Sequence, residues 1–210
     1  MKTLICIPCM DTIDTVFFES FLNLEKPDCD IKLTRATLIY DARNKLAQSA
    51  LWDGYDRIAW FDSDMVFAPD TLTRLMARLD EGAEFVTGLY FTRKPPMRPV
   101  IYTDIGARTD ENGVTIPYAN NYNDYPRDSY FEVAGAGFGG CVMTTELLTK
   151  IAKFGLPFSP IHGFGEDLSF CLKVSQIGVK MYCDSTIKLG HMAHVEIGEG
   201  NYTNEKPTRN

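Results

Sequence analysis

Two carboxylates one residue apart form the first candidate site in this sequence. Asp62-Ser63-Asp64 directly follows the apolar, β-prone run Ile58-Ala59-Trp60-Phe61, which places the acids at the C-terminal edge of a buried strand. Open α/β sheets bind ligands at that edge. Carboxylates at this spacing can share a hard divalent cation with the oxygens of a bound diphosphate. The same spacing also occurs in solvated loops, so the motif alone does not decide between a metal site and a turn.

A second pair of acids, Glu166 and Asp167, opens a segment in which Leu168, Cys171 and Leu172 recur at helical spacing. Acids in the first turn stabilise a helix by about 0.3–1 kcal/mol each through its dipole, so capping alone would explain this pair. The functional alternative is that a carboxylate held at this helix start takes a proton from an attacking hydroxyl group. The pair is therefore a candidate for general-base chemistry, and both explanations stay open.

The three histidines are candidates for completing a metal site. His191 comes a few residues after the strand that Val179 to Cys183 predict, and neutral imidazole is a good partner for carboxylates around a divalent cation. A single histidine is more often structural than catalytic, and His162 and His194 compete with His191 for the role. The choice among the three stays open at this point.

The segment that begins at Asp41 predicts a helix that can bind phosphate. Asp41 is a good N-cap, and Gly54 lies where a C-cap is expected. Arg43 and Asn44 then fall in the first turn, where free N–H groups attract anions and a guanidinium matches phosphate oxygens. The alternative for Arg43 is an ion pair at the surface. Proximity to the acidic edge of the sheet favours the phosphate role.

A glycine-rich segment, Gly135 to Gly140, precedes an apolar run that predicts a buried strand. Glycines at this density indicate positive φ angles or close approach of a ligand to the backbone. The segment lacks the following Lys-Ser or Lys-Thr of a P-loop and the early position of a dinucleotide fingerprint. We therefore expect a loop beneath a substrate.

Two further segments are candidates for substrate contact. Arg93 to Pro99 contains three cations and three prolines in seven residues, which predicts a stiff, exposed loop that either steers an anionic substrate or is a solvated turn. Tyr102 to Tyr130 is rich in turns and tyrosines, and Asn112-Gly113 marks a hairpin. Aromatic faces pack on sugar rings, so this segment either lines an acceptor site or forms a lobe stabilised by its own aromatics.

Strands and helices alternate along the chain, which predicts an α/β protein with a mixed, mainly parallel sheet flanked by helices. Strand-like runs and helical spacing alternate from the first residues to the last predicted strand. The predicted strands include Thr3 to Ile7, Ile31 to Leu33, Ile58 to Phe61, Glu84 to Tyr90 and Val179 to Cys183, and the predicted helices include Ile13 to Leu24 and those that begin at Asp41, Pro69, Thr145 and Glu166.

Length and composition bound the class of protein. The chain has 210 residues, 45% of them hydrophobic, which fits one domain with a packed core. A net charge of -7 gives no overall basic surface for nucleic acid or an anionic membrane. No apolar run approaches the roughly 18 residues of a transmembrane helix, and the first strand is too short for a signal-peptide core, so a cytoplasmic location is expected. The six scattered cysteines indicate reduced thiols, and a redox role for Cys6-Ile7-Pro8-Cys9 is less favoured because no helix follows directly.

In combination the motifs resemble a GT-A-type glycosyltransferase. A strand ending in Asp62-Ser63-Asp64, the glycines of Gly135 to Gly140, the helix start Gly165-Glu166-Asp167 and finally His191 occur in the order of that family. The helix start Ala42-Arg43-Asn44-Lys45-Leu46 adds to the match. From about Thr3 to His191 the sequence is similar to the compact, family-two-like enzymes of bacteria and phages.

The resemblance implies a single GT-A domain, the nucleotide-diphospho-sugar transferase fold, over residues 1–195. It also implies an acceptor-side insertion at about 102–130 and a polar tail at 196–210. The implied cofactors are a divalent cation, Mn²⁺ or Mg²⁺, and a nucleotide-sugar donor that we expect to be a UDP-sugar. The implied residues are Pro8, Asp41, Arg43, Asn44, Asp62 and Gly137 for the donor, Asp62, Asp64 and His191 for the metal, Asp167 as the base, and Glu166 as a group that holds the donor sugar or the acceptor.

The expected reaction is transfer of a sugar to a hydroxyl group with inversion. Direct displacement at an anomeric carbon needs a base near the acceptor, and it needs a metal and cations to neutralise the leaving diphosphate. The acceptor is left open among a glycan, a protein, a lipid and a modified nucleobase, because little sequence follows His191.

Two other functions stay open. A nucleotidyltransferase also pairs carboxylates with a metal, but such enzymes commonly carry a glycine-rich, cationic loop after the first strand, and Ile7 to Asp11 contain neither glycine nor cation. A catalytically inactive module that binds a nucleotide or a glycan would have the same motifs.

Overall fold

A seven-stranded sheet forms the centre of the protein, in the order β2-β1-β3-β10-β5-β11-β8. The computed structural model describes residues 1–35 and 38–193. Strands β2, β1, β3, β5 and β11 run in one direction, and β10 and β8 run in the other. The predicted mixed, mainly parallel sheet is confirmed. These strands are β1 (Thr3–Cys9), β2 (Cys29–Arg35), β3 (Arg57–Phe61), β5 (Phe85–Leu89), β8 (Tyr130–Val133), β10 (Gly140–Thr144) and β11 (Met181–Lys188).

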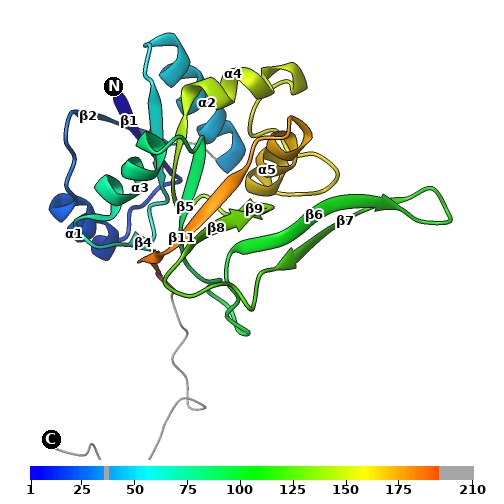
Figure 1. Cartoon of the computed structure of the whole chain (residues 1–210). Coiled ribbons are helices and arrows are strands. Elements are labelled where there is room, and N and C mark those ends of the chain that lie inside the picture. Colours follow the sequence, from blue (N-terminus) through cyan, green and yellow to red (C-terminus); the bar gives the residue numbers. More distant parts are fainter. Residues whose placement is uncertain (36–37, 194–210) are drawn as a thin grey trace, which may run out of the picture.

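Helices cover both faces of this sheet (Figure 1). One core cluster joins the sheet to α2, α4 and α5, and a second joins it to α1 and α3. The helices are α1 (Thr15–Asn23), α2 (Ile39–Trp52), α3 (Thr71–Asp80), α4 (Thr145–Ile151) and α5 (Glu166–Gln176), with a short 3₁₀ turn at Ala152–Phe154. None of the described helices is both long enough and apolar enough to cross a membrane.

Strand β3 shows why its apolar run is continuous. Ile58 and Trp60 pack in the cluster on the α2 side, and Ala59 and Phe61 pack in the cluster on the α1 side. Successive side chains of a strand point to opposite faces, so a strand covered on both faces needs apolar residues at every position. All four residues are fully buried, and the chain reaches the carboxyl edge of the sheet immediately after Phe61.

Strand β10 brings the glycine-rich segment to the same edge. It lies antiparallel between β3 and β5, with Gly140 opposite Phe61. The N–H of Asp62 donates to the carbonyl of Gly139 at 3.2 Å. The acidic loop and the glycine-rich segment, which are far apart in the sequence, are thus direct neighbours.

The predicted hairpin at Asn112-Gly113 is present and forms a long arm that extends from the body (Figure 1). Strands β6 (Ile101–Thr109) and β7 (Thr115–Asn121) form it, and β9 (Gly135–Ala136) pairs with the base of β6. A separate two-stranded pairing joins β4 (Met65–Val66) to β12 (Gly190–His191). This second pairing holds His191 beside the acidic loop.

Helix α2 begins three residues earlier than an N-cap at Asp41 predicts. It starts at Ile39 with Leu38 as the N-cap residue, so Asp41 is not the N-cap but lies in the first turn. There Asp41 forms an ion pair with Lys45 at 2.6 Å. Arg43 and Asn44 remain close to the helix start, and both are buried. The six cysteines are all free thiols, as expected.

Candidate active site

A cavity of about 690 Å³ lies at the carboxyl edge of the central sheet. Its walls combine the ends of β1, β3 and β5 with the loop that follows β5 and the start of α5. It is lined by Pro8, Cys9, Met10, Ile39, Asp62, Ser63, Asp64, Tyr90, Thr92, Arg93, Lys94, Val100, Asp167 and His191. Both acidic motifs and the expected metal-binding histidine therefore contribute to one cavity.

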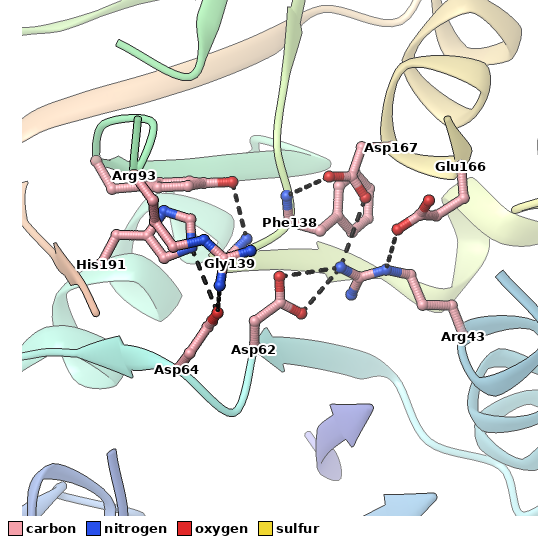
Figure 2. A network of polar contacts seen from close by, with 10 residues as sticks. Arg43, Asp62, Asp64, Arg93, Phe138, Gly139, Glu166, Asp167 and His191 are labelled. Carbon is pink, nitrogen blue, oxygen red and sulfur yellow. Dashed lines mark hydrogen bonds and ion pairs between the residues drawn. The ribbon is translucent and has the colours of Figure 1, made fainter. Parts of the chain in front are cut away.

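Arg43 is buried and lies at the centre of a cluster of partly buried carboxylates (Figure 2). Its Nη2 lies 2.9 and 3.2 Å from the two carboxylate oxygens of Asp62, and its Nε lies 3.3 Å from Oε1 of Glu166. The same Nη2 lies 3.5 Å from Oδ1 of Asp167. The guanidinium also packs against the rings of Trp60 and Phe138. One cation from α2 thus joins the end of β3 to the start of α5.

Burial and charge act in opposite directions on Arg43. Its side chain is 1% exposed, which disfavours the charged form, but the three carboxylates outweigh that effect and raise its pKa. Arg43 is therefore a permanent cation that holds the acids rather than a group open to the cavity. In this structure it faces Asp62, Glu166 and Asp167 and does not line the cavity.

Asp167 and Asp62 line the cavity, and Glu166, the third acid of this cluster, does not. Oδ2 of Asp167 accepts a hydrogen bond from the backbone N–H of Phe138 at 3.2 Å. Burial raises its pKa, Glu166 and Asp62 raise it further, and Arg43 acts in the opposite direction. Burial also raises the pKa of Asp62, against the effect of Arg43. A carboxylate with a raised pKa, held in a cavity, is suited to accept a proton.

Asp64 belongs to a different cluster from Asp62, although only one residue separates them. Its Oδ2 lies 2.7 Å from Nη1 of Arg93 and 3.5 Å from Nε2 of His191. Figure 2 shows Asp62 turned toward Arg43 and Asp64 turned toward Arg93 and His191. Despite some burial, the hydrogen bond to His191 and the charge of Arg93 lower the pKa of Asp64. The two acids of the motif therefore take separate partners.

The backbone around Asp64 fixes the position of His191. The β4–β12 pairing places His191 opposite Met65, and the N–H of Met192 donates to the carbonyl of Asp64 at 2.9 Å. Nδ1 of His191 lies 3.0 Å from the carbonyl oxygen of Phe91. Because a carbonyl only accepts, Nδ1 carries the hydrogen and Nε2 is the nitrogen that faces Asp64.

The Asp64–His191 pair fits a divalent cation. Metal-binding histidines commonly donate one ring N–H to a carbonyl and present the other nitrogen to the ion, as His191 does. An unprotonated Nε2 and a carboxylate oxygen are both acceptors, so a proton or a cation is needed between them. Burial alone would lower the pKa of His191, but the hydrogen bonds to Asp64 and to the backbone of Phe91, together with the charge of Asp64, raise it overall. Within residues 1–35 and 38–193, no group of three or more His, Cys, Asp or Glu side chains is arranged to hold a metal, so the ion would need further ligands from the substrate or water.

The remaining predicted site residues take different places. Pro8 lines the cavity. Asp41 is paired with Lys45 and does not line it. Oδ1 of Asn44 accepts the backbone N–H of Phe158 at 2.9 Å, so this side chain anchors the loop before α5. Of the alternative histidines, His162 does not line the cavity, and His194 lies outside the described residues.

Gly137 is buried beneath the cavity and is in contact with Tyr90 instead of open space. A Cβ at this position would lie 2.0 Å from the hydroxyl oxygen of Tyr90 and 2.7 Å from Val100. The Tyr90 hydroxyl accepts the N–H of Gly139 at 3.2 Å. Close side-chain packing, and not a ligand, therefore explains why glycine is needed at this position.

Tyr90 and Ile39 line the cavity but were not predicted as site residues, and Arg93 lines it from a loop that was predicted only as a candidate for substrate contact. Tyr90 directly follows β5, so its position at the end of a predicted strand was an available signal. Arg93 was part of a predicted basic loop, but the sequence contains no sign of its pairing with Asp64. The partner of a loop cation depends on how the loop folds back, which local pattern does not show.

Comparisons with solved structures agree with the observed fold. No family model and no curated protein matches the sequence. Among solved structures, the viral protein A197 of STIV superposes with a TM-score of 0.65 and 24% identity, over 91% of this chain and 86% of that protein. GalNAc-T7, solved with UDP, GalNAc and Mn²⁺, superposes with a TM-score of 0.62 and 10% identity. That alignment covers 98% of this chain and 45% of GalNAc-T7.

The fold is of the GT-A glycosyltransferase type. At these identities the similarity establishes the arrangement of the chain, and the chemistry has to be argued from its own residues. The chain spans less than half of GalNAc-T7, so the activity of that whole protein does not transfer with the fold.

Proposed function

We propose that this protein is a metal-dependent glycosyltransferase that moves a sugar from a nucleotide-sugar donor to an acceptor hydroxyl, with inversion at the anomeric carbon. The supporting observation is that Asp167 and the Asp64–His191 pair line the same cavity. Displacement needs a base near the acceptor and a charge-neutralising group at the leaving diphosphate, and these two clusters supply the two roles.

In this mechanism Asp167 takes the hydroxyl proton while the acceptor oxygen forms its bond to the anomeric carbon. The bond from that carbon to the phosphate oxygen breaks, and its electron pair leaves with the nucleoside diphosphate. Asp64 and His191 would hold the divalent cation, which supplies charge neutralisation at the diphosphate when it is bound. Burial, which raises the pKa of Asp167, makes its ionised form a stronger base.

Arg43 contributes by holding the acids, with Glu166 as one of its partners. Through contacts to Asp62 and Asp167 it fixes the distance between the two sides of the cavity. We assign the donor nucleotide to the side of the cavity walled by Pro8 and Ile39, and we expect a UDP-sugar there. The chain to residue 195 acts as one catalytic domain, with the 102–130 segment on the acceptor side.

The test is donor hydrolysis by the purified protein. The protein is incubated with a panel of nucleotide-sugars in Mn²⁺, and release of nucleoside diphosphate is measured with and without EDTA. We expect slow hydrolysis of one donor, its loss in EDTA, and its loss in Asp64→Ala with the melting temperature retained. If the protein binds a donor saturably but releases no nucleoside diphosphate with any of the acceptors tested, it is instead an inactive binding module.

A further inference from the structure

The ion pair between Arg93 and Asp64 lies on the border of two cavities. Beside the 690 Å³ cavity is a second of about 620 Å³, and Met10, Ser63, Asp64 and Arg93 line both. The Arg93 side chain is 50% exposed, with its Nη1 2.7 Å from Oδ2 of Asp64. Arg93 therefore faces the candidate donor space while it holds the carboxylate assigned to the metal.

Arg93 and a divalent cation would compete for the same carboxylate oxygen. Oδ2 of Asp64 is the atom that faces both Nη1 of Arg93 and Nε2 of His191. A cation held by Asp64 and His191 would lie beside the guanidinium, and the two positive charges would repel each other. Ion pairs between partly exposed groups contribute little stability, so this one is easily exchanged.

The loop that carries Arg93 is fixed at its base, so the exchange needs only side-chain movement. Phe91 and Pro99 form a backbone bridge. The N–H of Thr92 donates to the carbonyl of Arg98 at 2.9 Å, and the N–H of Arg98 donates to the hydroxyl of Thr92 at 3.0 Å. A guanidinium released from Asp64 stays next to the cavity, where a diphosphate would be the nearest anion to match its fork.

We propose that Arg93 is a diphosphate-binding residue. Its guanidinium pairs with Asp64 until metal and nucleotide bind, and it then moves to pair with the diphosphate. The proposal rests on the proposed function of this site. It assigns two opposite effects to one side chain. Arg93 weakens the binding of the metal alone, and it strengthens the binding of nucleoside diphosphate once the metal is present.

The test compares Arg93→Ala with Arg98→Ala, a matched cation of the same loop that lines neither cavity. Calorimetry measures the affinity for Mn²⁺ alone, and then for UDP in saturating Mn²⁺. We expect Arg93→Ala to bind Mn²⁺ about two- to fivefold more tightly, because an exposed ion pair is lost. We expect it to bind UDP about tenfold or more weakly, because a charge-assisted contact is lost. Arg98→Ala should match the wild type in both measurements, and Arg93→Lys should recover part of the UDP affinity.

Opposite signs for the two affinities in Arg93→Ala support the proposal. A loss of both affinities would show that Arg93 only supports the site, and unchanged UDP affinity would show that it does not reach the diphosphate; either result overturns the proposal. If the wild type binds neither Mn²⁺ nor UDP, the proposed function itself fails, and the inference fails with it. Melting curves of the variants confirm that each is folded.

Discussion

The two carboxylate clusters of the cavity are built in opposite ways. The Arg43 cluster is enclosed between α2, β3 and α5, and its cation is 1% exposed. The Asp64 cluster lies on a loop and a two-stranded pairing, and its cation, Arg93, is 50% exposed. A buried cation with several acid partners holds a fixed geometry, whereas an exposed pair exchanges partners readily. We therefore expect the proposed catalytic side to be rigid and the proposed metal side to adjust to its ligands.

The largest expected difference is in stability. Arg43→Ala should lower the free energy of unfolding by about 3–5 kcal/mol, because it removes the buried cation of three partly buried acids. Arg93→Ala should lower it by about 1 kcal/mol or less. Urea unfolding of both variants and the wild type, without metal, measures this. Equal losses would show that the two clusters do not differ in rigidity.

The catalytic side is tested by two isosteric substitutions. Asp167→Asn should reduce turnover by about 10²-fold or more, equivalent to about 2.7 kcal/mol, with donor affinity nearly unchanged. Glu166→Gln should reduce turnover less, because Glu166 does not line the cavity and glutamine can still accept from Arg43. Turnover, donor affinity and melting temperature are measured together. Greater loss in Glu166→Gln than in Asp167→Asn would transfer the role of base to Glu166.

The packing beneath the cavity is tested at Gly137. Gly137→Ala should destabilise the protein by about 1–3 kcal/mol, because its methyl group would overlap the Tyr90 hydroxyl. Tyr90→Phe removes that hydroxyl together with its hydrogen bond to Gly139. The double variant should be more stable than the sum of the single effects predicts, which a double-mutant cycle in urea measures. If the effects of the two substitutions are additive, the added methyl group does not overlap the Tyr90 hydroxyl.

The smallest effect concerns the pH dependence of stability without metal. Because its folded pKa is raised, Asp167 binds more protons in the native state than in the unfolded state, so its contribution to stability falls as pH rises above the ordinary value of 3.8. Asp167→Asn removes this contribution. The variant should match the wild type near pH 3.8 and melt a few degrees higher near pH 8. A wild type that melts higher than the variant at pH 8 would contradict a raised pKa.

Much of the site's location was predictable, because it follows from local patterns. An apolar strand ending on Asp62 and Asp64 indicates the carboxyl edge of a sheet, and the periodic segment after Glu166 indicates a helix start at that edge. The structure confirms both placements. The histidine after the last strand is also found beside the acidic loop, since a short pairing returns it there.

The partners within the site were not predictable. Arg43 was expected to face phosphate, but its partners include Glu166, which lies 123 positions away in the sequence. Burial of a cation depends on the packing of three separate elements. Likewise, Asp62 and Asp64 share a motif but turn to different clusters, because the chain bends between them. Spacing in a sequence predicts proximity, and the direction of a side chain depends on the fold.

The position of β10 has a consequence for how the protein is made. This strand lies between β3 and β5, yet it follows both in the chain. During synthesis β3 and β5 cannot join one sheet until Gly140–Thr144 has been made. Such long-range pairings form slowly. Until then, the edges of β3 and β5 that pair with β10 have no partner. The edge of the sheet that carries the candidate site is therefore completed late, and nascent chains that stop before β10 expose unpaired strand edges, which favour aggregation.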